Sequence, residues 1–382
     1  MALTDWIQWI IKASSYIGLS ALAGGVVLLY ACQNSLIYPA NFPAGSRTVV
    51  ATPDEHGMPE YEAVTITTPD QVKIQAYYIP HHTGGLDSSA AAEAAVDGLR
   101  HRTAGRVAGG KVANTTVLFC HANAGNMGHR LPIAKVFHTR FRTNVVMFSY
   151  RGYGHSEGSP SEKGMKIDAQ AALDWTLAHP QLKHTKVIVY GQSIGGAVAI
   201  NLAANNQETI AALIVENTFL TLRKLIPSVM PLIRHFTFLC HQIWDSETAI
   251  ASIPRMPILL LSGGRDELIP SQQMLALCCA ARNARRRKGE RKIDGSEATF
   301  ETDSNGVRFV RFPSGTHNET CVQPGYFDAI FAFWSSFVAV EGVGKTDVAS
   351  PSVPKAESEG TTSSGLAGVV KVVRQGGASA SL

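Results

Sequence analysis

Apolar and polar positions along the chain follow two alternating patterns, one typical of strands and one typical of helices. Residues 61–67 and 72–79 alternate apolar and polar side chains, as half-exposed antiparallel strands do. Short continuous apolar runs, typical of buried strands, follow at 117–120, 144–148, 186–190, 211–215, 258–261 and 307–312. Helical patterns separate these runs and cover residues 127–140, 161–179, 194–205, 271–281 and 325–338.

Buried strands that alternate with helices indicate an α/β fold, with a mostly parallel central sheet and helices on both of its faces. The two segments of alternating pattern add an antiparallel start to that sheet. In folds of this kind, ligands and reactive groups lie at the carboxyl ends of the strands. We therefore search for candidate chemistry in the loops that follow the predicted strands.

The first part of the chain differs from the rest because it is long, apolar and uncharged. No Asp, Glu, Lys or Arg occurs between Ala13 and Ser46, and residues 16–32 are nearly all apolar or small. About 20 such residues cross a bilayer as a helix, so we expect residues 1–46 to form a single-pass membrane anchor. A cleaved signal peptide is the alternative. Lys12, which precedes the apolar segment, favours an N-terminus in the cytoplasm.

The remaining chain divides into a folded domain and a tail. We expect one domain over residues 47–341, with surface insertions at 81–113 and 283–306, which are rich in small or polar residues. Residues 342–382 contain few large apolar side chains, which predicts a disordered tail. Residues 222–253 have a helical pattern with large apolar residues at the middle, and form either a lid over the site or an ordinary packed helix.

Composition excludes several classes of protein. The 382 residues include 34 Gly and 18 Pro, which are ordinary frequencies and exclude a collagen-like or wholly disordered chain. The net charge of +4 comes from a basic cluster at residues 282–292, and the nearly neutral remainder argues against nucleic-acid binding. The six cysteines show no metal-ligand spacing, so we expect no metal and no cofactor.

The pattern Gly-x-Ser-x-Gly, typical of a serine nucleophile on a tight strand-to-helix turn, occurs twice. Ser193, within residues 191–195, follows a predicted buried strand and precedes a predicted helix. Ser156, within residues 154–158, lies in a Gly-rich loop that runs into Pro160. The local context therefore predicts that Ser193 is the nucleophile and that Ser156 is a loop residue.

A serine nucleophile needs a general base, and the base needs a carboxylate to orient it. In sheets of this type the order along the chain is Ser, then Asp or Glu, then His. Asp266 follows the predicted strand 258–261, and His317 follows the predicted strand 307–312. His317 is also the only histidine after Asp266. We therefore predict a catalytic triad of Ser193, Asp266 and His317.

Other residues at strand ends are weaker candidates for these roles. Glu267 lies one residue beyond Asp266, and Glu216 follows the preceding strand, where the acid sometimes lies. His121 and His155 are more typical of residues that order loops. The oxyanion hole needs two backbone N–H groups, one from the residue after the nucleophile and one from the loop after the third strand. Ile194 supplies the first, and we assign the second to Asn123 in the loop 120–126.

Six segments carry a resemblance to a known family: HANAGN (121–126), SYRGYGHSEGSPSE (149–162), GQSIGG (191–196), ENTF (216–219), GGRDELIP (263–270) and GTHNE (315–319). Together they resemble the alpha/beta-hydrolase domain-containing protein 13 group, which consists of membrane-anchored serine hydrolases. The resemblance covers residues 15–340 and implies an alpha/beta-hydrolase fold with an N-terminal transmembrane helix. It also implies Ser193 as nucleophile, Asp266 as acid and His317 as base.

We therefore expect a membrane-anchored serine hydrolase that cleaves an ester or an acyl-thioester through an acyl-enzyme. An apolar lid beside a membrane anchor favours a lipid or an acylated protein, including a palmitoylated one, as the substrate. Two alternatives stay open at this point. One is a serine peptidase of the prolyl-oligopeptidase-like kind, and the other is a non-catalytic scaffold of hydrolase fold.

Overall fold

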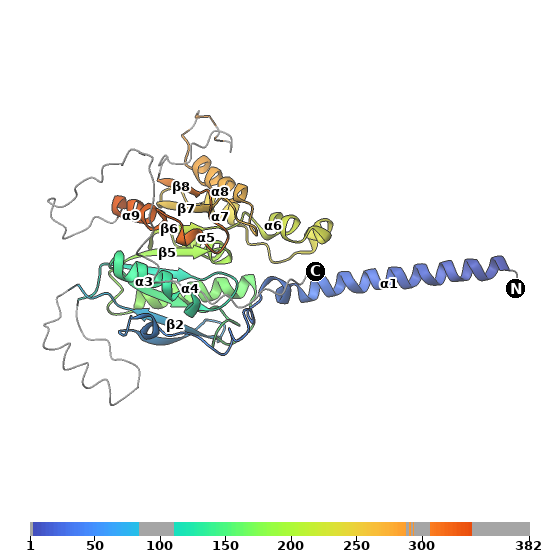
Figure 1. Cartoon of the computed structure of the whole chain (residues 1–382), viewed down its shortest axis with the longest axis horizontal. Coiled ribbons are helices and arrows are strands. Elements are labelled where there is room, and N and C mark those ends of the chain that lie inside the picture. Colours follow the sequence, from blue (N-terminus) through green and yellow to red (C-terminus); the bar gives the residue numbers. More distant parts are fainter. Residues whose placement is uncertain (1–2, 84–110, 288–289, 292, 294–305, 338–382) are drawn as a thin grey trace, which may run out of the picture. The chain divides into compact units, whose positions relative to one another are not determined.

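The computed structural model describes residues 3–83, 111–287, 290–291, 293 and 306–337 (Figure 1). The predicted tail 342–382 and most of the two predicted insertions lie outside the described residues. The described strands form one eight-stranded sheet, in the order β1-β2-β4-β3-β5-β6-β7-β8. The predicted α/β fold with a mostly parallel sheet is thereby confirmed.

The sheet begins antiparallel and continues parallel, as the change in hydrophobic pattern predicts. β1 (Glu62–Thr67) pairs antiparallel with β2 (Lys73–Ile79), and β2 pairs antiparallel with β4 (Asn144–Phe148). All further pairs are parallel. They involve β3 (Thr115–Cys120), β5 (Lys186–Gln192), β6 (Ile210–Glu216), β7 (Ile258–Gly263) and β8 (Val307–Phe312).

Two hydrophobic clusters cover the two faces of the sheet, which explains the continuous apolar runs of its central strands. In β5, Val187 and Val189 face one cluster, whereas Ile188 and Tyr190 face the other. The first cluster includes residues of α4 (Glu162–Ala178), α5 (Ile194–Asn205) and α8 (Ser271–Ala284). The second includes residues of α3 (Leu131–Arg140) and α9 (Tyr326–Phe337).

Proline residues divide two segments for which the sequence predicts continuous helix. Residues 127–140 form a short 3₁₀ helix, η2 (Met127–Arg130), followed by α3, which carries a proline in its first turn. Residues 222–253 form α6 (Leu222–Val229), η3 (Pro231–Leu239) and α7 (Ser246–Ala251). Proline, which lacks an N–H group and interrupts the hydrogen-bond ladder of a helix, lies at the starts of α3 and η3, whereas residues 240–245 between η3 and α7 contain no proline. We call residues 222–244 the cap.

The N-terminal helix α1 (Leu3–Ile37) has 35 residues, and among the described residues it is the one helix long and apolar enough to cross a membrane. Its first part is exposed in the isolated chain, whereas its last turns contact the cap. Gln33 donates a hydrogen bond to Leu239 O (3.3 Å) and accepts one from His241 N–H (2.8 Å). The residue after the helix, Tyr38, is buried and accepts from the Trp244 indole (2.9 Å).

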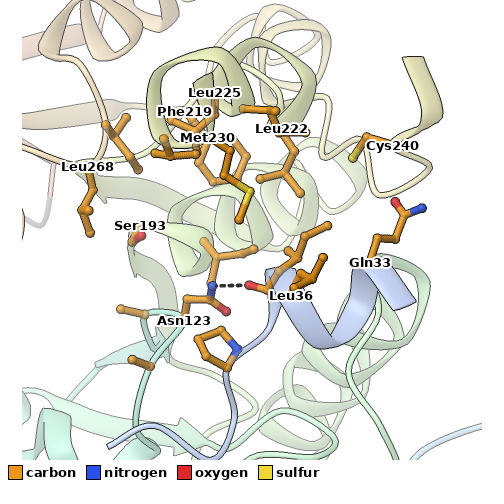
Figure 2. Close-up of a pocket in the computed structure, with 18 of the residues that line it drawn as sticks. Gln33, Leu36, Asn123, Ser193, Phe219, Leu222, Leu225, Met230, Cys240 and Leu268 are labelled. Carbon is orange, nitrogen blue, oxygen red and sulfur yellow. Dashed lines mark hydrogen bonds between the residues drawn. The ribbon is translucent and has the colours of Figure 1, made fainter. Parts of the chain in front are cut away.

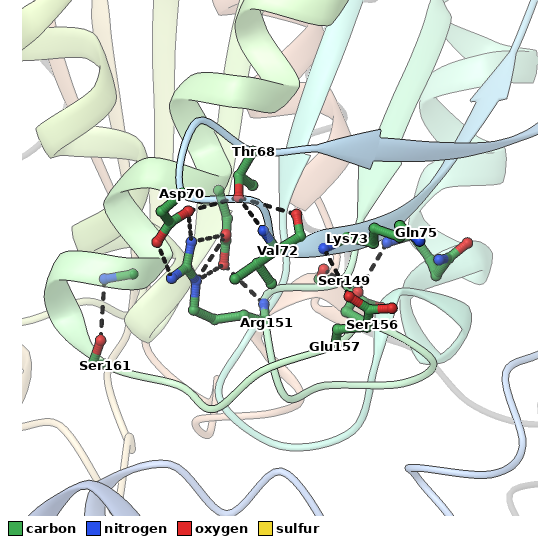
Figure 3. A network of polar contacts seen from close by, with 12 residues as sticks. Thr68, Asp70, Val72, Lys73, Gln75, Ser149, Arg151, Ser156, Glu157 and Ser161 are labelled. Carbon is green, nitrogen blue, oxygen red and sulfur yellow. Dashed lines mark hydrogen bonds and ion pairs between the residues drawn. The ribbon is translucent and has the colours of Figure 1, made fainter.

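An ion-pair network of the exposed Asp70 with the buried Arg151 and Asp168 fixes the turn between β1 and β2 to the loop after β4 (Figure 3). Two nitrogens of the Arg151 guanidinium donate to the two Asp70 oxygens, at 2.7 and 2.9 Å. Arg151 Nε and Nη2 also bond the carboxylate of Asp168, which is fully buried on α4. This paired arginine holds the pKa of the Asp70 carboxyl well below its usual range.

Candidate active site

Ser193 lies in the tight turn between β5 and α5, where the sequence motif predicts a nucleophile. Its backbone is strained, with φ of +56°, a region that residues other than glycine rarely adopt. A Cβ atom on Gly191 would lie 2.1 Å from Gly195 O, and one on Gly195 would lie 2.2 Å from Cys120 O. Both glycines of the motif are therefore required for the close approach that forms the turn.

The structure brings Ser193, His317 and Asp266 together from the carboxyl ends of β5, β8 and β7. The Ser193 hydroxyl lies 3.0 Å from His317 Nε2. His317 Nδ1 lies 2.8 and 3.0 Å from the two Asp266 oxygens. A carboxylate on the Nδ1 side keeps the proton on that nitrogen, so Nε2 is free to accept the hydroxyl proton. This is the geometry that a Ser-His-Asp relay requires.

Backbone groups hold the Asp266 carboxylate in place. Asp266 Oδ1 accepts hydrogen bonds from the N–H groups of Leu268 (2.9 Å) and Ile269 (2.8 Å). The side chain of Asp266 is only 1% exposed and that of His317 is 7% exposed. The carboxylate is thus fixed by its own turn before it contacts the imidazole.

The two rival carboxylates make other contacts. Glu267 accepts a hydrogen bond from the backbone N–H of His317 (3.1 Å) and so fixes the loop that carries His317. The imidazole ring of His317 contacts Asp266 instead. Glu216 is fully buried and accepts hydrogen bonds from the hydroxyls of Tyr190 (2.5 Å) and Tyr326 (2.6 Å). Burial raises the pKa of the Glu216 carboxyl.

Asn217 is a site residue that the sequence analysis did not single out. It follows β6 with φ of +45°, a conformation that asparagine tolerates better than most residues. Its amide nitrogen donates to His317 O (3.1 Å) and Thr320 Oγ1 (3.0 Å), and its oxygen accepts from Gly263 N–H (2.7 Å). Asn217 therefore joins the ends of β6 and β7 to the loop that carries His317.

The second Gly-x-Ser-x-Gly motif is structural. Ser156 is fully buried, donates to Ser149 O (2.7 Å) and accepts from Gln75 N–H (2.9 Å) (Figure 3). It continues the hydrogen bonding of β2 beyond the end of β4. The hydroxyl of Ser156 thus has two backbone partners and lies in a loop, as its sequence context predicts.

The two histidines at other strand ends order loops. His155 Nε2 donates to Thr48 O (3.1 Å). His121 is fully buried, its Nδ1 donates to Ala122 O (2.7 Å), and its ring packs 4.3 Å from that of Tyr150. Burial lowers the pKa of His121 to about 3, so this ring is neutral at physiological pH.

The two residues predicted to supply the oxyanion hole, Ile194 and Asn123, line the same cavity as Ser193. Ile194 is the first residue of α5, and Asn123 lies in the loop between β3 and η2. Within the described part of the chain, neither backbone N–H has a hydrogen-bond partner. The side chain of Asn123, in contrast, makes two bonds: it donates to Ile37 O (2.6 Å) and accepts from the Tyr153 hydroxyl (2.7 Å).

A cavity of about 390 Å³ opens above Ser193 and His317 (Figure 2). Its size is within the range of small-molecule sites. Apolar side chains from three parts of the chain form most of its walls. They come from the end of α1 (Leu29, Leu36, Ile37), from the cap (Leu222, Leu225, Ile226, Met230, Ile233, Phe236) and from the segments after β6 and β7 (Phe219, Leu268, Ile269).

Among the described residues, no group of three or more His, Cys, Asp or Glu side chains is placed to hold a metal ion.

This fold and site define an α/β hydrolase, and residues 115–236 match the family model described as the alpha/beta hydrolase fold. The chain belongs to the bem46-like group of α/β hydrolases, as its relatives show. It is 40% identical to protein bem46 of Schizosaccharomyces pombe over 331 residues, which cover 85% of this chain and 94% of bem46. The resemblance stated from the six sequence segments is thereby confirmed.

Two further relatives extend the group. An uncharacterized membrane protein of Saccharomyces cerevisiae is 36% identical over 83% of this chain and 94% of its own length. The alpha/beta hydrolase domain-containing protein WAV2 of Arabidopsis thaliana is 31% identical over 80% of this chain and 87% of its own length. Among solved structures, an esterase of Pyrococcus furiosus is similar, with a TM-score of 0.55, 19% identity, and coverage of 76% of this chain and 96% of the esterase. At 19% identity, the similarity to the Pyrococcus furiosus esterase shows a shared fold.

Proposed function

We propose that the protein is a membrane-anchored serine hydrolase that cleaves esters or acyl-thioesters whose acyl chain occupies the apolar cavity. Ser193 is the nucleophile, His317 the general base and Asp266 the carboxylate that orients the imidazole. The observation that carries this proposal is the hydrogen-bonded series Ser193–His317–Asp266 at the wall of an apolar cavity.

The reaction follows from the positions of these atoms. His317 Nε2 takes the hydroxyl proton while Ser193 Oγ bonds to the carbonyl carbon of the substrate. The carbonyl oxygen becomes an oxyanion, which accepts hydrogen bonds from the N–H groups of Ile194 and Asn123. The leaving alcohol or thiol takes the proton from His317 as its bond to carbon breaks. Water then attacks the acyl-enzyme through the same steps, and Ser193 recovers its proton.

The strained backbone of Ser193 argues for catalysis over the scaffold alternative. A residue held in a sparsely populated backbone region costs about 1–3 kcal/mol and persists where the surrounding structure enforces it. In this chain the backbone packs so closely around the turn that added Cβ atoms on Gly191 and Gly195 would lie 2.1 and 2.2 Å from neighbouring carbonyl oxygens, and the Ser193 hydroxyl in this turn lies 3.0 Å from His317 Nε2. A scaffold without catalysis would gain nothing from the strained backbone at Ser193, so the strain favours an enzyme.

The surface around the cavity supports a substrate that comes from a membrane. η3 has no buried residue, and it exposes Leu232 (95% exposed) and Phe238 (67% exposed). The cap contains no Asp or Glu between Leu222 and Trp244 but carries three Lys or Arg residues. Apolar side chains with basic neighbours are typical of surfaces that bind anionic lipid. The same cap contacts α1, the candidate membrane helix, through Gln33.

A panel of 4-nitrophenyl esters with acyl chains of two to sixteen carbons, together with matching thioesters, tests the proposal. We expect kcat/KM to rise with chain length. Leu225→Trp, which fills the cavity, should selectively reduce cleavage of the long esters. Leu232→Trp, the same change at an exposed residue outside the cavity, should not. A preference for the acetyl ester that Leu225→Trp leaves unchanged would contradict the proposal, and turnover of peptides alone would favour the peptidase alternative.

A further inference from the structure

The loop that carries Asn123 is attached to the segment that links α1 to the domain. The Asn123 amide donates to Ile37 O at 2.6 Å, and Figure 2 shows this bond beside Leu36. Ile37 is the last residue of α1. The last four carbonyl groups of a helix have no partner within the helix. Asn123 therefore supplies the hydrogen bond that the end of α1 lacks.

Further bonds attach the same loop to residues 42–49. The N–H of Gly125 donates to Phe42 O (2.8 Å). The Asn126 amide donates to Ser46 O (2.8 Å) and Val49 O (2.9 Å), and Asn126 is fully buried. Three of the four positions 123–126 thus donate hydrogen bonds to carbonyl groups at the end of α1 or in the segment that follows it.

The end of α1 is itself fixed to the domain. Gln33 is 5% exposed and bonds the cap at Leu239 and His241. Tyr38 is 3% exposed, donates to Gln242 Oε1 (2.9 Å) and accepts from Trp244. The carbonyl of Ile37 lies between these two anchored residues. It therefore provides a fixed acceptor for the Asn123 amide.

We propose that the end of α1 holds the oxyanion loop in its working position, and that Asn123 is the positioning residue that couples the two. This inference rests on the proposed function. The Asn123 side chain has one bond to Ile37 O at the end of α1 and one to the Tyr153 hydroxyl, while its backbone N–H is the proposed donor to the oxyanion. The membrane helix is then more than an anchor, because its last turn forms part of the active site.

The energetic consequence follows from how oxyanion holes work. A donor is effective only when it is held about 2.7–3.1 Å from the developing oxyanion, and the loss of one donor lowers kcat by about 10²–10³-fold. A shift of the loop by about 1 Å costs up to about 10²-fold in rate. The bonds from Asn123 to Ile37 and Tyr153 prevent such a shift. Their loss should therefore affect the transition state more than substrate binding.

The test uses the full chain in detergent micelles with 4-nitrophenyl butyrate as the probe. Asn123→Leu removes both side-chain bonds without adding charge, and Asn123→Asp keeps the bond from Tyr153 but loses the donor to Ile37. Tyr153→Phe removes the other bond. Asn205→Leu and Asn205→Asp, at an exposed residue at the end of α5, are the matched controls. For each variant we would measure kcat, KM, the pH profile and the midpoint of thermal unfolding.

We expect Asn123→Leu and Asn123→Asp to lower kcat about 10–100-fold, with KM within about threefold of wild type. Tyr153→Phe should have a smaller effect in the same direction, and the pH profile should keep its midpoints because the triad is untouched. The Asn205 variants should behave as wild type.

Two results would overturn the inference on its own. One is an unchanged kcat in Asn123→Leu, and a fall in kcat in Asn123→Asp beside it would show that the introduced charge is responsible. The other is a fall in kcat that only matches the loss of folded protein, measured by active-site titration. A fluorophosphonate probe that fails to label Ser193 in the wild-type protein would overturn the proposed function together with this inference.

Discussion

At the scale of single residues, two of the five described non-glycine residues with positive φ lie at the candidate site. Ser193 and Asn217 both have positive φ, +56° and +45°, and they follow the neighbouring strands β5 and β6. Ser193 aims its hydroxyl at His317, and Asn217 holds the backbone of His317. The strained turn at Ser193 therefore depends on Asn217, which holds His317 within hydrogen-bond distance of the Ser193 hydroxyl.

Replacing Asp266 or Glu216 by its amide should show which of the two carboxylates is the acid of the triad. Asp266→Asn should lower kcat by about 10⁴-fold, because loss of the carboxylate favours the wrong imidazole tautomer. Glu216→Gln, which keeps an acceptor for Tyr190 and Tyr326, should retain most of the activity. Both variants would be measured with the same soluble ester. If Glu216→Gln proved the more damaging change and Asp266→Asn were mild, the acid would belong to the loop after β6.

His121 should make stability depend on pH. Burial lowers its pKa from the ordinary histidine value of 6.5 to about 3, so the unfolded chain binds a proton at pH values where the folded chain does not. The contribution of His121 to the free energy of unfolding is therefore at its maximum above about pH 6.5. It decreases as the pH is lowered toward 3. His121→Phe keeps an aromatic ring beside Tyr150 but cannot be protonated.

Urea unfolding of both proteins at pH 7 and pH 4.5 measures this effect. The fall in free energy between the two pH values should be smaller in His121→Phe than in wild type. Equal falls in the two proteins would show that the His121 ring is not held neutral by burial.

At the scale of elements, buried strands could be predicted from sequence better than anything else. Each central strand is covered on both faces, so its apolar run is continuous and its ends lie within one or two residues of the prediction. Ser193, Asp266 and His317 could be found because each follows such a strand. The cap was less predictable, because its helical pattern is divided into α6 and η3, with Pro231 at the start of η3.

The long-range side-chain contacts of Asn123 and Asn217 could not be predicted from sequence. Asn123 bonds Ile37 across 86 positions, and Asn217 bonds His317 across 100. Neither contact leaves a periodic pattern, because each depends on a single polar residue. The family motif around residues 216–219 contains Asn217, but its partners appear only once the ends of β6, β7 and β8 are brought together.

The Arg151 network should be a strong determinant of stability for the β1–β2 turn and α4. Arg151→Met should lower the free energy of unfolding by about 3–5 kcal/mol, because it leaves the fully buried Asp168 carboxylate without its charge partner. Arg255→Met, at an exposed arginine, is the matched control and should have little effect. Chemical denaturation measures both.

A double variant makes the prediction about Arg151 sharper. Arg151→Met with Asp168→Leu removes both buried charges and should recover much of the lost stability, because a buried pair contributes little compared with a buried unpaired charge. A double variant no more stable than Arg151→Met would show that packing around the arginine, and not its charge, is responsible.

At the scale of the whole molecule, the proposed anchor and the catalytic domain meet at the cavity. The end of α1, the cap and the oxyanion loop share its walls. If α1 spans a bilayer, a lipid acyl chain has a short route from the membrane to Ser193. This arrangement connects the two main features of the sequence, the uncharged N-terminal stretch and the triad.

Alkaline carbonate extraction of cells that express the full chain tests the anchor. About 20 apolar residues suffice to span a bilayer, so the protein should stay in the membrane pellet with its N-terminal residues intact. Recovery in the soluble fraction with residues 1–32 missing would instead indicate a cleaved signal peptide. Mass spectrometry of the N-terminal peptide distinguishes the two outcomes.

Labelling by a fluorophosphonate probe tests the central claim, that Ser193 is an activated nucleophile, most directly. The probe should label the wild-type protein and leave Ser193→Ala unlabelled. Ser156→Ala, in the second Gly-x-Ser-x-Gly motif, should be labelled like wild type per folded molecule, because its hydroxyl only bonds the backbone of Ser149 and Gln75. Full labelling of Ser193→Ala, or no labelling of the wild-type protein, would contradict the account.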